Sequence, residues 1–233
     1  MRYPGETAST PPRGGGPGAF ALARIYGYIE RMLKSSGGPS IGLEPASTKQ
    51  KIVQAAFDTL SSEGFAAATA RSIARRGEFN QALIFYHFGT LNDLLLAALE
   101  VSGAARLTRY REEMSDANTI EQRIQTATRL YREDLDSGHI TVLAEIIAGS
   151  LSEPSLGPKV IDLMKPWIDF AAEIIEGSIA GSVFEALIDP HTAAFAVVAM
   201  YLGVDLLTLL DKDDSRAEAL FQSAGGLATL LTS

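Results

Sequence analysis

Polar and cationic side chains that could contact nucleic acid are concentrated in residues 68–88, which read ATARSIARRGEFNQALIFYHF. Arg71, Arg75 and Arg76 supply positive charge for phosphate contacts. Gln81 supplies a side-chain amide that can pair with N6 and N7 of adenine. Three arginines are also typical of a solvated helix face. The interpretation therefore depends on the elements that position them.

Two helix-start residues divide this stretch. Thr69 precedes a short helical run to Arg76, and Asn80 precedes a second run that ends in aromatic residues. Residues 77–79 separate the two runs. Two short helices joined by a tight turn form a helix-turn-helix, whose second helix lies in the major groove of DNA.

The flanking segments predict further helices that hold this unit. Ser47 and Gln50 have the spacing of a capping box, and Gly64 is typical of the C-terminal end of a helix. Thr90 and Asp93 predict the start of a long helix after the second run. The first and last of these helices are expected to pack against the two short ones.

The run from Thr48 to Leu95 resembles the N-terminal domain of the tetracycline-repressor (TetR) family of transcriptional regulators. This resemblance covers about a fifth of the chain, and its positions follow one another without rearrangement. The matching residues are Ile52, Ala55, Ala56, Phe57, Glu63, Gly64, Phe65, Thr69, Ile73, Ala74, Tyr86, His87, Phe88, Gly89, Leu94 and Leu95.

The resemblance implies that nine residues contact double-stranded DNA: Thr69, Arg71, Asn80, Gln81, Ala82, Leu83, Phe85, Tyr86 and His87. Thr69 and Arg71 are expected on phosphates, and Gln81 on a base. Leu83 is placed to touch a thymine methyl group. Tyr86 and His87 are expected on the backbone, although His87 is also typical of a capping or packing histidine.

The chain departs from the family pattern at several of these positions. Residues 77–79 are Gly-Glu-Phe where the family usually has Ala-Gly-Val, and the pair Ala82-Leu83 replaces Gly-Thr. Glu78 would carry strain of order 1–2 kcal/mol at a position that favours glycine, so Gly77 is expected to take up the bend instead. Phe85 replaces a tyrosine, and Leu91 replaces a lysine that touches phosphate. Each change removes a polar, cationic or flexible group from the expected DNA face. An all-helical ligand-binding or interaction protein that has lost specific DNA binding is therefore the alternative.

The net charge of −8 is unevenly distributed. Residues 1–44 carry five Lys/Arg and three Asp/Glu, residues 45–100 carry five of each, and residues 101–233 carry ten against twenty. Screening limits charge effects to roughly 10 Å at 0.1 M salt, so the distant acidity does not exclude a specific DNA site. It argues against loose, non-specific binding.

Composition predicts a cytoplasmic protein without membrane contact. The chain has no cysteine, which removes disulfides and thiolate chemistry. Its N-terminus lacks the pattern of a signal peptide, and the apolar stretches are expected to be too interrupted to span a membrane.

We expect no enzyme, no metal site and no cofactor. The histidines His87, His139 and His191 have no partner at helical metal-site spacing, and no phosphate-binding glycine loop or nucleophile elbow occurs. Carboxylates in the C-terminal half are expected on helix surfaces.

The predicted fold is all-α, with about nine helices. Residues 1–45 form a Gly/Pro-rich extension in which residues 19–34 are either an extra helix or a poorly ordered segment. Residues 46–92 form the helix-turn-helix domain. Residues 93–233 form a larger helical domain, expected by resemblance to bind an effector and to dimerise.

The helices predicted at residues 190–210 and 215–231 bear on assembly, because the family builds a four-helix bundle from such a pair and its two-fold mate. The residues expected at this interface are Phe195, Val198, Leu202, Leu206, Phe221 and Leu227. The residues expected to line an effector pocket are Tyr131, His139, Met164, Trp167 and Phe170. Both sets are also typical of ordinary core packing. The resemblance implies a homodimeric repressor that a small molecule releases from DNA.

Overall fold

The computed structural model describes the backbone of residues 47–232, together with their side chains except at residues 120 and 224–232. The extension at residues 1–45, with its candidate helix at 19–34, lies outside the described residues. All regular elements in the described range are helices, which confirms the predicted all-α class. They are α2 (Thr48–Glu63), α3 (Ala70–Arg76), α4 (Ala82–Phe88), α5 (Leu91–Ser115), α6 (Ile120–Ser137), α7 (His139–Ser152), α8 (Leu156–Ile179), α9 (Pro190–Asp211) and α10 (Ser215–Thr232).

Capping residues set most of the helix starts, as the sequence predicts. Ser47 and Gln50 form the expected capping box of α2. Thr69 caps α3 by accepting a hydrogen bond from the backbone N–H of Ser72. Asn80 accepts from the backbone N–H of Ala82, so it satisfies an early donor of α4 from one residue before the formal cap.

The helix-turn-helix is held by an apolar core. Ile52 on α2, Ile73 on α3 and Ile84 on α4 are fully buried, together with Leu94 at the start of α5. Ile84 is the one fully buried side chain of α4 among the described residues, and the partly buried Leu83 and Phe88 pack against the same core. The opposite face of α4 is left available to solvent.

The turn between α3 and α4 differs from expectation. Gly77 has an ordinary φ of −88°, and the left-handed conformation falls instead on Glu78, with φ 53°. A side chain in that conformation costs of order 1–2 kcal/mol. Gly77 is needed for space, because a Cβ there would lie 2.3 Å from the Phe79 ring and 2.9 Å from Ala55.

Helix α7 joins the helix-turn-helix to the rest of the molecule. The backbone N–H of Phe65 donates to the carboxylate of Glu145 at 2.7 Å. The Phe65 ring lies so close to Gly149 that an added Cβ would sit 2.6 Å from it. Lys159 at the start of α8 pairs with Asp93 at 2.7 Å. Both α7 and α8 therefore contact the segment that positions α3 and α4.

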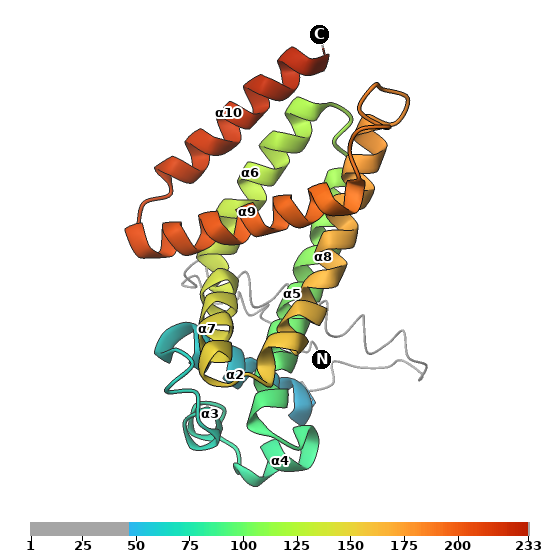
Figure 1. Cartoon of the computed structure of the whole chain (residues 1–233). Coiled ribbons are helices and arrows are strands. Elements are labelled where there is room, and N and C mark those ends of the chain that lie inside the picture. Colours follow the sequence, from blue (N-terminus) through green and yellow to red (C-terminus); the bar gives the residue numbers. More distant parts are fainter. Residues whose placement is uncertain (1–46, 233) are drawn as a thin grey trace, which may run out of the picture.

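Long helices extend from the helix-turn-helix to the opposite end of the molecule. In Figure 1, α5 and α8 run side by side from α4 towards the opposite end of the molecule, where α10 lies beside α6. Helix α9 crosses this group and packs chiefly against α8. One cluster of buried residues runs from α2 through the start of α5 into α7 and the first half of α8. A second, smaller cluster of Tyr110, Leu130 and Phe170 lies further along these helices, and Trp167 packs against both clusters.

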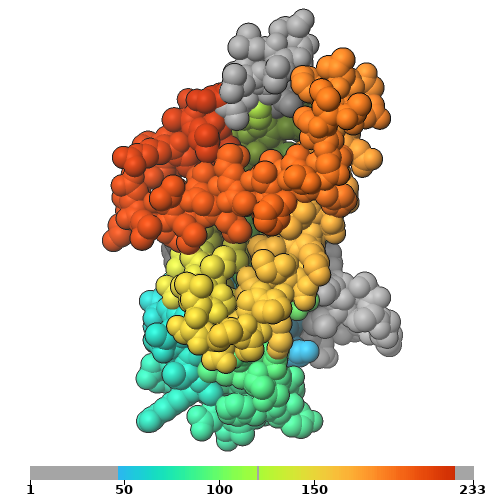
Figure 2. All heavy atoms as spheres, in the orientation of Figure 1, coloured from blue at the N-terminus to red at the C-terminus, as the bar shows by residue number. Residues whose placement is uncertain are grey.

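Helix α9 corrects the expectation that no stretch is long and apolar enough to span a membrane. It has 22 residues, and its most apolar 18-residue window has a mean hydropathy of 2.1 with only 11% of that window buried. In Figure 2 it forms a band across the front surface. One such helix is weak evidence for a membrane span, because the same composition serves helices that pack against protein. The exposed apolar face nevertheless calls for a partner.

Candidate DNA-binding surface and effector domain

The nine residues expected at DNA occupy one end of the molecule, on α3, α4 and their connections (Figure 1). Two of them, Leu83 and His87, are half-buried. The side chains of Phe85 and Tyr86 are 50% and 82% exposed, which is unusual for aromatic residues. The remaining exposed members are Thr69, Arg71, Asn80, Gln81 and Ala82.

Two arginines at this end of the molecule have no ion-pair partner among the described residues. Among the described residues, neither Arg71 nor Arg75 forms an ion pair, and both are exposed. Arg76 differs, because it pairs with Glu63 at 2.5 Å and donates to Ser62. The arrangement leaves Arg71 and Arg75 able to approach phosphates, whereas Arg76 fastens α3 to α2.

Packing accounts for two of the apolar departures on this face. Leu83 and Leu91 both pack in part against the core cluster of the helix-turn-helix. Their side chains therefore contribute to the position of α4 and of the start of α5.

A buried polar centre lies at the meeting point of the helices in the second half of the chain. Arg106 on α5 forms an ion pair with Asp134 on α6, and both side chains are almost fully buried. Tyr110 donates to Asp134 at 2.7 Å, and the Tyr201 hydroxyl of α9 lies 3.4 Å from the same carboxylate. Asp205, one helical turn beyond Tyr201, is 2% exposed.

Asp205 is the unsatisfied member of this centre. Neither of its carboxylate oxygens has a hydrogen-bond partner among the described residues. Burial raises its pKa to about 8, an effect that nearby Arg106 opposes and Asp134 strengthens. Burial also lowers the pKa of His139 on α7 well below its usual value, and Arg106 adds to that effect. The His139 Nδ1 atom lies 2.9 Å from the Ser102 hydroxyl.

Asp205 makes stability depend on pH in a predictable direction. Between about pH 4 and 8 the folded chain holds a proton at Asp205 that the unfolded chain has released, so rising pH lowers the free energy of unfolding. Buried neutral His139 lowers stability only as pH falls below about 6.5. The window from pH 6.5 to 8 therefore isolates Asp205.

We predict that Asp205→Asn reduces this loss. Wild-type protein should lose up to about 2 kcal/mol between pH 6.5 and 8, and the variant should lose markedly less. Urea denaturation across the window measures the difference. Asp211→Asn, at the exposed end of the same helix, serves as the control and should keep the wild-type slope. Equal slopes for wild type and Asp205→Asn would contradict the assignment.

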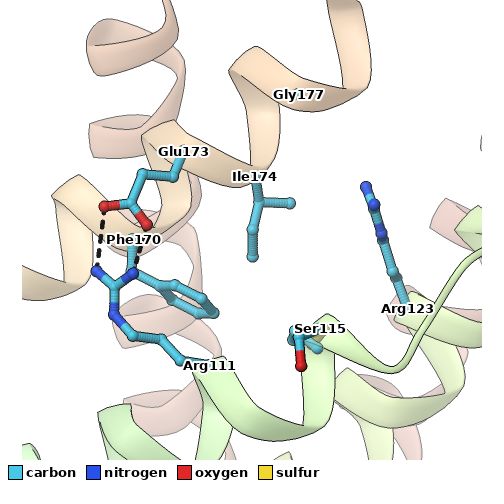
Figure 3. Close-up of a pocket in the computed structure, with 8 residues that line it drawn as sticks. Arg111, Ser115, Arg123, Phe170, Glu173, Ile174 and Gly177 are labelled. Carbon is cyan, nitrogen blue, oxygen red and sulfur yellow. Dashed lines mark hydrogen bonds and ion pairs between the residues drawn. The ribbon is translucent and has the colours of Figure 1, made fainter.

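Most of the residues expected to line an effector pocket lie in the packed interior. Tyr131 is fully buried, and its hydroxyl donates to Thr208 at 2.9 Å. Trp167 packs edge-on to Tyr110 at 5.3 Å and under the Arg106 guanidinium at 5.0 Å. The remaining members are His139 and Met164, which are buried, and Phe170, which lines a cavity between α5, α6 and α8 (Figure 3).

The residues expected at a dimer interface fall into three groups. Phe195 and Leu206 are 61% and 39% exposed on α9. Val198, Leu202 and Phe221 are half-buried, and the side chain of Leu227 lies outside the described residues. The structure extends the exposed apolar face of α9 to further residues, which are Val197, Met200, Leu207 and Leu210.

Known regulatory proteins resemble this chain in its helix-turn-helix. Residues 52–98 match the family described as bacterial regulatory proteins, tetR family. The HTH-type transcriptional repressor Rv3405c of Mycobacterium tuberculosis is 36% identical over 88 residues, which cover 38% of this chain and 46% of that protein. The chain thus matches less than half the length of that relative.

Two broader similarities cover the helical domain as well. The HTH-type transcriptional regulator UidR of Escherichia coli is 22% identical over 188 residues, covering 81% of this chain and 93% of that protein. The fatty acid degradation regulator FadR from Bacillus halodurans shares the fold, with a TM-score of 0.65 at 17% identity over 80% of this chain and 96% of that chain. Residues 52–98 thus match the tetR family of bacterial regulatory proteins, and the chain as a whole shares its helical fold with solved transcriptional regulators.

Proposed function

We propose that the chain is a homodimeric transcriptional regulator that acts in the cytoplasm, binds double-stranded DNA through α3 and α4, and represses transcription. The observation that supports this most is the face of α4. Its aromatic side chains are exposed beside two arginines that have no ion-pair partner among the described residues. Exposed aromatic side chains of this kind typically mark a surface that binds a partner. The whole helix-turn-helix, residues 46–92, serves as the DNA-binding domain.

The remaining residues, 93–233, serve as the effector-binding and dimerisation domain. An effector bound among α5, α6, α7 and α8 would move helices that touch the helix-turn-helix directly. Phe65 contacts Glu145 and Gly149 of α7, and the buried core of the helix-turn-helix extends to Leu156 and Val160 of α8. A shift of these helices changes the spacing of the two recognition helices in a dimer, and operator affinity falls.

The apolar face of α9 supplies the dimer interface in this proposal. One recognition helix reads too few base pairs for useful specificity, and a two-fold dimer reads two half-sites roughly 34–36 Å apart. Near the middle of the exposed face, a Cβ added to Gly203 would meet no atom within 4 Å. A second helix can therefore approach α9 closely at that point.

The role of α4 is tested by two substitutions with opposite signatures. Gln81→Ala should cost roughly 1–3 kcal/mol at one base position and relax specificity there. Arg71→Ala should weaken binding to all sequences alike and reduce the slope of log K against log salt by about one unit. Fluorescence anisotropy with single-base operator variants at several salt concentrations separates the two. The reverse pattern would mean that the two roles are exchanged.

A second candidate is a helical ligand-binding protein without specific DNA binding. Glu78 favours it, because a strained acidic residue occupies the turn of the helix-turn-helix. In this case both substitutions would leave DNA affinity unchanged, and binding would show no preference among sequences.

A further inference from the structure

A cavity of about 260 Å³ lies between the end of α5, the start of α6 and the second half of α8 (Figure 3). Met114, Phe170 and Ile174 supply an apolar wall, and the polar groups stand around it. The complete lining consists of Arg111, Met114, Ser115, Arg123, Phe170, Glu173, Ile174 and Gly177. The volume is below the range of drug-sized pockets, so it suits a small molecule with an apolar body.

One of the two arginines in the lining has its charge compensated. Arg111 forms a two-pronged ion pair with Glu173, in which Nη2 and Oε1 are 3.2 Å apart. Its guanidinium also lies 5.0 Å from the centre of the Phe170 ring. In Figure 3 this pair stands at one side of the cavity. Arg111 therefore forms part of the wall and adds no net charge.

Arg123, on the opposite side of the cavity, is different. Its Nε donates to the carbonyl of Ala117 at 3.2 Å and its Nη1 donates to the Ser178 hydroxyl at 3.0 Å. Both acceptors are neutral, and they occupy two of the five N–H donors of the guanidinium. Within residues 47–232, Arg123 has no carboxylate at ion-pair distance.

Arg123 differs in this respect from the other arginines of α5 and α6. All other arginines of α5 and α6 pair with a carboxylate: Arg106, Arg109, Arg111, Arg129 and Arg132. The surrounding half of the chain carries twenty acidic residues against ten basic ones, so partners are plentiful. A guanidinium left with neutral partners at the edge of an apolar cavity is suited to hold an anion from outside the chain.

We infer that this cavity binds a small amphiphile with one carboxylate head group, held by Arg123, and an apolar body held by Met114, Phe170 and Ile174. Arg111, Glu173 and Arg123 together carry one net positive charge, which matches a single carboxylate. This inference rests on the proposed function, because it names the chemical class of the effector. The ligand would sit between α5 and α8, whose other ends contact the helix-turn-helix.

The test uses octanoate and its neutral counterpart octanamide as probes of the full chain. Trp167, the one tryptophan of the sequence, lies one turn before Phe170 and reports binding by its fluorescence. We expect saturable binding of octanoate, one per chain by calorimetry, at least tenfold tighter than octanamide. Arg123→Gln should remove that tenfold preference and leave octanamide binding unchanged.

Arg132→Gln is the matched control, because this arginine lies on the same helix but pairs with Glu218. It should keep the preference for octanoate. Equal affinities of wild type for the two probes, no saturable binding of octanoate, or an unchanged preference in Arg123→Gln would each overturn the inference. The titration needs no DNA. A chain that binds its operator but not octanoate contradicts this inference alone, and one that binds octanoate but no DNA contradicts the proposed function.

Discussion

Replacing Asp134 with alanine should lower the free energy of unfolding by about 3–5 kcal/mol, the largest loss of stability that we expect from a single substitution. Asp134 pairs with Arg106 in the interior and accepts a hydrogen bond from Tyr110. Its removal leaves the Arg106 charge buried without its partner. Asp205 is a further carboxylate whose charge Arg106 stabilises, but burial opposes its ionisation.

The control is an ion pair between helices that remains exposed. Lys159→Ala breaks the pair with Asp93, whose two side chains are 53% and 41% exposed, and should cost less than about 1 kcal/mol. Urea denaturation at one fixed protein concentration compares the two variants, because the proposed dimer would make apparent stability depend on concentration. Similar small losses for both would mean that Arg106 is not held as a buried charge.

Placing a carboxylate on the exposed face of α9 should separate the dimer and weaken operator binding by roughly 10²–10⁴-fold, since the second half-site no longer contributes. Leu207→Glu is the substitution of choice. Its side chain is 67% exposed, so the folded monomer tolerates the charge, whereas a paired apolar face does not. Analytical ultracentrifugation gives the mass, and fluorescence anisotropy gives the affinity.

Leu151→Glu supplies the comparison, because this leucine is 83% exposed but lies on α7. It should remain dimeric with unchanged affinity. If Leu207→Glu remains a dimer of full affinity, α9 is not the interface.

Local signals predicted the helices well because each acts within a few residues. Thr119 and Gln122, which have capping-box spacing in the sequence, begin α6, and Gly138, in the left-handed conformation, ends it. The order of helices after the helix-turn-helix follows from the same signals. The path of each long helix across the others could not be predicted, because it depends on packing between distant segments.

The buried polar centre was missed for a physical reason. A charged residue is normally placed on a helix surface, and the carboxylates of this half were expected there. Asp205 carried one usable signal, because it is the one charged residue in the run from Met200 to Leu210. Tyr201, Asp205 and Thr208 also share one face of α9. The lack of a carboxylate partner for Arg123 could not be predicted from the sequence, because it depends on which distant helices pack beside α6.

In the turn of the helix-turn-helix, the bend falls on Glu78 and not on the neighbouring Gly77. Strain at Glu78 was recognised as a cost, but Gly77 was expected as the residue that could relieve it. In the structure Gly77 is fixed by contacts with Phe79 and Ala55, so Glu78 adopts the left-handed conformation. Tertiary contact decided the outcome over local preference.

The most direct test of the central claim is the ratio of specific to non-specific DNA affinity. Fluorescence anisotropy would compare a duplex from the DNA upstream of the gene, and one selected from a random library, with scrambled duplexes of equal length at moderate salt. We predict that at least one of the two binds roughly 10³-fold or more tightly than its scrambled form. Equal affinities for all duplexes would contradict a sequence-specific regulator and favour the protein without specific DNA binding.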